Sequence, residues 1–147
     1  MRSIIQYPNY LLRQRALTVP AEEVVDDIVK EMFRTLKKSG GVGLAANQVG
    51  NSSSIFVYKL ASGETGYFTA PDIIWMSDKY LTTEGCLSLD GRTYVVTRYR
   101  KIQVRSFNRG YETLTGEIAQ IFQHEYDHLQ GILICDHGIK KEKEEVS

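Results

Sequence analysis

The 147-residue chain is predicted to fold as one α+β domain, with mostly antiparallel sheets packed around a central helix. Two observations support this prediction. Short β-prone runs separated by turn residues fill the middle of the chain, and an amphipathic helical pattern follows them near the C-terminus. Strands grouped before one long helix are typical of α+β folds.

The first expected element is a helix over residues 21–39, because apolar residues recur there at close to the helical period. These residues are Val24, Val25, Ile28, Val29, Met32, Phe33 and Leu36. Gly40 and Gly41 are expected to end this helix, since glycine adopts the left-handed conformation that commonly follows a helix C-terminus.

Four β-prone runs follow in the middle of the chain. They predict strands over residues 54–58, 72–76, 93–97 and 101–107. Gly63, Gly91 and residues 108–110 have the composition of turns and are expected to separate the strands.

The central helix is expected over residues 117–130, and its apolar half carries ionisable side chains. On a helical wheel this half contains Ile118, Ile121, Phe122, His124, Glu125, His128 and Leu129. Gly131 is a plausible left-handed end to the helix. Because unpaired polar groups are costly to bury, three of them on one apolar face indicate a shared ligand.

The spacing of these three groups indicates a metal. His124 and His128 lie four residues apart, so both rings can point from one helix face at a single ion. Glu125 lies between them, as in the H-E-x-x-H signature of metal hydrolases, where the Glu binds no metal and moves protons. The sequence therefore predicts a catalytic metal site on this helix.

A catalytic site of this kind needs a third protein ligand. The metzincin pattern would place a third His where this chain has Ile134, and the residues after His128 end in a charged run. The ligand is therefore expected upstream, where Cys86 lies in a turn-like stretch between strand-like segments. Cys135 follows the helix and is most simply a small buried hydrophobe.

A glycine-rich segment over residues 41–50 is a further candidate. Its glycines permit a ligand to approach the backbone closely, and Gln48 offers an amide donor. The segment has neither the Lys and Ser/Thr of a P-loop nor a Rossmann fingerprint.

Composition narrows the function class. Charges balance, 18 against 18, so no nucleic-acid partner is expected. No signal peptide or bilayer-spanning run is apparent, which favours a cytoplasmic protein with no membrane partner. The protein is expected to be a monomer. Residues 1–139 are expected to form a single catalytic metallohydrolase domain, and residues 140–147 a charged, disordered tail.

Three segments, taken together and in order, resemble the peptide deformylases. That family is recognised by G-x-G-L-A-A-x-Q, E-G-C-L-S and Q-H-E-x-D-H, which match residues 41–48, 84–88 and 123–128 without a mismatch. The resemblance implies the deformylase fold. It also implies hydrolysis of the formyl group from N-formylmethionyl nascent chains, releasing formate, with the ribosome as a possible place of action.

The resemblance also implies roles for individual residues. Cys86, His124 and His128 would bind one divalent ion, physiologically Fe²⁺, although Zn²⁺, Ni²⁺ or Co²⁺ can occupy such a site. Glu125 would carry protons. The Gln48 side chain and the Leu87 backbone N–H would stabilise the oxyanion.

The same resemblance locates the substrate. The peptide backbone would pair with the edge formed by Val42, Gly43 and Leu44 and with the chain near Gly85. The methionine side chain would enter an apolar pocket near Val42 and Ile121. Arg98 would pair with Glu84 and fix the loop that carries Cys86.

The chain departs from the family pattern in four places. Ala70-Pro71 and Asp90-Gly91 stand where Asn-Pro and Pro-Gly are common, Gln120 replaces a frequent Arg, and no long C-terminal helix follows. Two other function classes stay open at this point: a metallopeptidase, and a non-catalytic metal-binding module closed by Cys135 or His137 as a fourth ligand.

Overall fold

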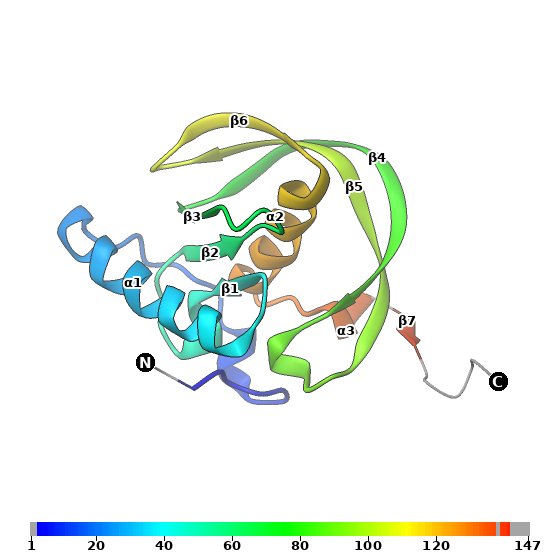
Figure 1. Cartoon of the computed structure of the whole chain (residues 1–147), viewed down its shortest axis with the longest axis horizontal. Helices are drawn as coiled ribbons and strands as arrows, with labels where there is room; N and C mark the ends of the chain where they lie inside the picture. Colours follow the sequence, from blue (N-terminus) through cyan, green and yellow to red (C-terminus); the bar gives the residue numbers. More distant parts are fainter. Residues whose placement is uncertain (1–2, 138, 142–147) are drawn as a thin grey trace.

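Two antiparallel sheets lie on either side of the helix α2 in the computed structural model, which describes residues 3–137 and 139–141 (Figure 1). One sheet has the order β1-β2-β3. In the other, β5 lies between β4 and β6 and also pairs with β7. The α+β prediction and the central position of the helix are confirmed.

The helices and strands follow one another along the chain in a simple order. They are α1 (Glu22–Ser39), β1 (Gly43–Ala45), β2 (Ile55–Lys59), β3 (Thr65–Thr69), β4 (Asp72–Gly85), β5 (Thr93–Ser106), β6 (Gly110–Thr115), α2 (Gly116–Leu129), α3 (Ile134–His137) and β7 (Ile139–Lys141). Short 3₁₀ turns lie at Tyr10–Arg13, Ala46–Val49 and Leu87–Leu89.

Helix α1 covers the outer face of the first sheet. It ends at Gly40, whose φ of 74° is the left-handed conformation predicted for that glycine. Val29, Met32 and Leu36 of the helix are buried against alternate residues of β2, Ile55 and Val57. Phe56 and Tyr58 of β2 face the other way, because successive side chains of a strand point to opposite faces.

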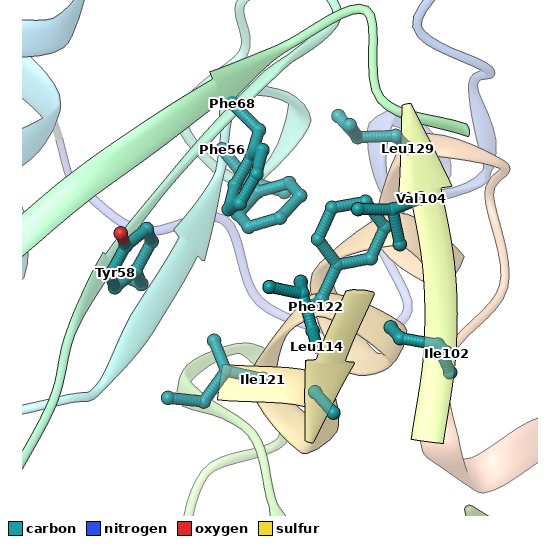
Figure 2. Packing of buried hydrophobic residues seen from close by; sticks show 11 residues of the cluster. Phe56, Tyr58, Phe68, Ile102, Val104, Leu114, Ile121, Phe122 and Leu129 are labelled. Carbon is teal, nitrogen blue, oxygen red and sulfur yellow. The ribbon is translucent and has the colours of Figure 1, made fainter. Parts of the chain in front are cut away.

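The opposite face of β2 packs on α2 through aromatic rings (Figure 2). Phe122 of α2 meets Phe56 and Phe68 edge-on, with ring centroids 5.1 and 4.9 Å apart. Ile102 and Val104 of β5 close the cluster from the second sheet. Helix α2 is therefore fixed from both sides by apolar contacts, which favours a rigid platform for its polar residues.

The strands differ from the prediction in length and number. β4 and β5 each run for 14 residues, and β5 joins the two runs expected over residues 93–97 and 101–107. β1, β3 and β6 were not predicted as strands. Helix α2 begins and ends one residue earlier than expected, and Gly131 follows it with a φ of 79°.

Two expectations near the C-terminus were wrong. Lys140 and Lys141 belong to β7, which pairs antiparallel with β5 at residues 93–95, so the expected tail begins at least two residues too early. The rest of it, residues 142–147, lies outside the described residues. Cys135 is half-buried in α3 instead of fully buried: it packs against the cluster around Leu89, and its thiol contacts the Asp136 carboxylate. Among the described residues, no helix has the length and apolarity needed to cross a membrane.

Candidate active site

Helix α2 directs its ionisable side chains toward the end of β4. His124, Glu125 and His128 lie on the buried side of the helix, as the wheel predicted, and His128 is only 1% exposed. The two imidazole rings have centroids 5.1 Å apart. One turn of helix therefore presents both rings to the same point.

Cys86 reaches this point from the second sheet. It is the first residue after β4, in an extended conformation, and precedes the short 3₁₀ turn Leu87–Leu89. Its Sγ lies 3.2 Å from Nε2 of His128. The structure thus brings together the three ligands that the sequence suggested.

The geometry of this cluster suits a transition-metal ion. One ligand atom from each of Cys86, His124 and His128 lies within 4.8 Å of the others. Ligands of a tetrahedral site with thiolate and imidazole bonds of about 2.3 and 2.0 Å are themselves about 3.5 Å apart. Burial also lowers the pKa of His128 well below its usual value, and the neutral ring is the form that binds metal.

Glu84 orients one of the ligands. His124 donates from Nδ1 to the Glu84 carboxylate at 2.8 Å, which leaves Nε2 of the ring for a metal. Arg98 donates to both oxygens of Glu84, at 2.7 and 2.9 Å, as the resemblance implied. Burial would raise the pKa of Glu84, but the bonds from His124 and Arg98 lower it to about 2, so the carboxylate stays charged.

Glu125 lies beside the ligands in a different environment. It is 4% exposed, and its Oε1 has no hydrogen-bond partner among the described residues. Burial accordingly raises its pKa to about 7, although the nearby charge of His124 opposes the rise. A carboxyl group with a pKa near neutrality can both accept and return a proton.

The backbone of β1 approaches Glu125 so closely that only glycine fits. A Cβ at Gly43 would lie 2.5 Å from Oε2 of Glu125, and one at Gly41 would lie 2.7 Å from the Leu87 side chain. Gly41 and Gly43, two of the three glycines of the 41–50 segment, therefore have a steric reason to lack side chains.

Gln48 has a fixed orientation in the buried turn after β1. Its Oε1 accepts a hydrogen bond from the Ala45 N–H at 2.9 Å. Its Nε2 donates to Ser88 at 3.0 Å and lies 3.8 Å from Sγ of Cys86. The amide nitrogen therefore faces the cluster, as an oxyanion donor would have to.

A pocket of about 650 Å³ opens onto the cluster between β1, the end of β4 and α2. Its lining includes Val42, Gly43, Gly85 and Ile121, which were predicted to contact substrate, and Leu87, whose backbone N–H was predicted to stabilise the oxyanion. Leu44 differs: its side chain is fully buried in the core around α1 and is absent from the lining. Only its backbone can face a ligand there.

Sequence reasoning missed several residues of this pocket. Thr83 and Glu117 line it, and so do Asp90, Gly91 and Gln120, which had been noted only as departures from a family pattern. Glu117, Gln120, Ile121 and His124 are three or four residues apart on α2. The helical period could therefore have placed them on one wall.

The fourth-ligand alternative receives no support from Cys135. The group of possible metal ligands found in the described part of the chain comprises Cys86, His124 and His128, and Cys135 is not in it. The side chain of His137 lies outside the described residues.

Two imidazoles, one thiol and a neighbouring carboxyl group meet at the base of a pocket, and these are the groups that a hydrolase-type metal site requires. The family model for polypeptide deformylase matches residues 1–144. The chain belongs to the polypeptide deformylase family. It is thus an enzyme that acts on formylated nascent peptides, which confirms the family, fold and activity expected from the three motifs.

Individual relatives agree with this assignment. The peptide deformylase of Aquifex aeolicus is 36% identical over 92% of this chain and 86% of its own, and that of Clostridium botulinum is 35% identical over 96% and 99%. Among solved structures, the Plasmodium falciparum enzyme matches with a TM-score of 0.88 at 31% identity, covering 98% of this chain and 89% of its own. The Thermotoga maritima enzyme matches with 0.85 at 34% identity, covering 93% and 97%.

Proposed function

We propose that this deformylase holds one divalent ion through Cys86, His124 and His128 and uses Glu125 to move the proton during formyl hydrolysis. The observation that carries the proposal is the position of Glu125, which is buried between the two His ligands without being one of the three clustered ligands. A divalent ion at this site would supply a Lewis acid that lowers the pKa of water.

The residues of the chain provide the remaining steps. Glu125 takes a proton from the attacking water and returns it to the leaving amine, for which a pKa of about 7 is well placed. The Gln48 amide, held by Ala45, donates to the developing oxyanion, and the Leu87 backbone N–H is the proposed second donor.

The substrate is proposed to bind as an added strand. β1 lies at the edge of its sheet, and its first residue Gly43 and the preceding Val42 line the pocket together with Gly85 at the end of β4. An extended peptide between these two edges would make main-chain hydrogen bonds with the backbone of Val42, Gly43 and Leu44 on one side and of Gly85 on the other. Its methionine side chain would lie against Val42 and Ile121.

The donor set of one thiolate and two imidazoles suits iron, zinc, cobalt and nickel alike. We propose Fe²⁺ as the physiological ion, following the family resemblance, in a cytoplasmic monomer that meets its substrate as it leaves the ribosome. Metal analysis of protein prepared without oxygen tests the ion, and a stoichiometric zinc content in such protein would contradict the choice of iron.

The decisive experiment compares Glu125→Gln with the wild-type enzyme on a formyl-methionyl peptide. Formate release should fall by at least about 10²-fold, because the variant has no base to accept the proton, while metal content stays near one per chain. Glu117→Gln, on the same helix and in the same pocket, is the matched control and should remain active. If Glu125→Gln loses its metal instead, Glu125 is a ligand and the proposed mechanism is wrong.

A further inference from the structure

The carboxylate of Glu84 receives one hydrogen bond that neither Arg98 nor His124 supplies. Nε2 of Gln120 donates to Oε2 of Glu84 at 3.0 Å. Oε2 also accepts from Nε of Arg98 at 2.9 Å, whereas Oε1 accepts from His124 at 2.8 Å and from Nη2 of Arg98 at 2.7 Å. Gln120 and His124 therefore hold opposite oxygens of one carboxylate, and both belong to α2.

A residue of β4, Tyr80, sets the orientation of the Gln120 amide. The Tyr80 hydroxyl donates to Oε1 of Gln120 at 3.2 Å. Rotating the amide by half a turn would place its carbonyl oxygen 3.0 Å from the Glu84 carboxylate, where two acceptors would repel each other. The Tyr80 ring is itself covered by the Arg100 guanidinium, 4.4 Å from the ring centroid.

We propose that Gln120 is a positioning residue, which fixes Glu84 and through it the ring of the ligand His124, and that Tyr80 orients Gln120 for this task. A carboxylate held at both oxygens has little freedom to rotate. The Nδ1–H bond of His124 then keeps the ring directed at the ion site. This inference rests on the metal assignment proposed above.

Gln120 also connects this hydrogen-bond chain to the substrate pocket. It lines the pocket beside Ile121, where the methionine side chain is proposed to lie. Both ends of its amide are bonded to protein groups, so it can form this wall without an unsatisfied polar atom. Tyr80 is not among the residues that line the described pocket, which separates orientation from substrate contact experimentally.

The test uses two variants. Gln120→Leu keeps a side chain of similar size in the pocket wall but removes the hydrogen-bond donor, and Tyr80→Phe removes only the hydroxyl. Gln103→Leu and Tyr111→Phe make the same chemical changes at exposed positions of the second sheet and serve as controls. Each protein is loaded with Co²⁺. Its absorption spectrum, its metal dissociation constant against a competing chelator, its kcat and KM, and its thermal midpoint are then measured.

Gln120→Leu should bind Co²⁺ about 10-fold more weakly, with an altered absorption spectrum and a lower kcat. Tyr80→Phe should change the same quantities in the same direction by a smaller factor and leave KM unchanged. The proposal is overturned if both variants lose only thermal stability, while the Co²⁺ absorption spectrum is unchanged and the Co²⁺ dissociation constant stays within two-fold of the wild-type value. Should Gln120→Leu fail to fold, Tyr80→Phe alone decides. A wild-type protein that neither binds Co²⁺ nor releases formate would instead refute the proposed function.

Discussion

At the scale of single residues, two carboxyl groups of the site have opposite properties because their partners differ. Glu84 is bonded by Arg98, His124 and Gln120, and its pKa falls to about 2. Glu125 has one oxygen without a partner in the described structure, and burial raises its pKa to about 7. Glu84 is thus charged at neutral pH, whereas Glu125 is able to exchange protons there.

The low pKa of Glu84 predicts a specific loss of stability in acid. Its native pKa lies below the unfolded value of 4.5, so its contribution is complete above that pH and is lost as the pH falls toward 2. Lowering a pKa from 4.5 to about 2 corresponds to about 3 kcal/mol of unfolding free energy. Chemical denaturation of the metal-free protein between pH 6 and 2 measures this loss, and Glu84→Gln should flatten the profile in that range. An equally steep profile in the variant would assign the acid sensitivity to other groups.

The two cysteines should respond differently to the same substitution. Cys86→Ser should lose the thiolate environment of the metal and nearly all formate release, because the hydroxyl oxygen is a much poorer ligand for these ions. Cys135→Ser should stay active, since this half-buried thiol is not one of the clustered ligands. Metal content and activity of the two variants decide the point, and the reverse pattern would mean that the wrong cysteine was assigned.

At the scale of elements, the close approach of β1 to α2 limits the position of Glu125, the proposed proton carrier. Gly43→Ala would bring a methyl group to 2.5 Å from the Glu125 carboxylate, so the carboxylate must move. We expect kcat to fall by about 10²-fold, the cost of displacing a reacting group by about 1 Å. Gly85→Ala is the comparison, because its Cβ would make only ordinary contacts of 3.8 Å or more. Equal losses in both variants would show that strand pairing with the substrate, and not Glu125, limits the rate.

The two long helices α1 and α2 could be predicted from the sequence almost to the residue, because burial on one side imposes a 3.6-residue period. The four-residue helix α3 is too short to show such a period and was not predicted. The long β5 could not be predicted as one strand. Its inward positions include Tyr94, Val96, Ile102 and Val104, but the two alternate positions between these pairs are arginines. Arg98 is buried through ion pairs and not through apolarity, and Arg100 is exposed. These two residues interrupt the hydrophobic alternation on which the prediction depended.

The missed strands have a different cause. β3 contains Gly66, where a Cβ would clash with the Tyr58 hydroxyl, and β6 begins at Gly110 and has Leu114 as its one buried residue. Because of these glycines, the segments of both strands resemble turns in the sequence. The site was predicted better than the sheets because ligand spacing on one helix is local, whereas the role of Gln120 depends on Glu84, 36 residues away on another element.

At the scale of the whole molecule, β7 returns the end of the chain to the second sheet. It pairs with β5 at residues 93–95, adjacent to Tyr94 and Val96, which pack with Leu89 and Cys86. The edge of β5 beside Cys86 is therefore covered by β7, and two of its three residues, Lys140 and Lys141, had been expected to belong to the tail.

Truncation should separate β7 from the residues after it. A chain ending at residue 138 should unfold more easily by about 2 kcal/mol, because it loses the ladder hydrogen bonds at about 1 kcal/mol each. A chain ending at Lys141 should keep its unfolding free energy within about 0.5 kcal/mol and its full formate release. Chemical denaturation of both chains measures the difference. A large loss in the longer chain would show that residues 142–147 contribute to the fold.

The aromatic packing of α2 has a consequence for how the enzyme acquires its ion. Phe122 anchors the helix between the two sheets through contacts that involve no ligand residue. The cradle for the ion should thus exist as soon as the chain has folded, unlike that of a zinc finger, which forms only around its metal. Maturation of the enzyme would then be a separate, later event governed by the ions present in the compartment. The ion of a folded molecule could then be removed and replaced by another ion, without synthesis of a new chain.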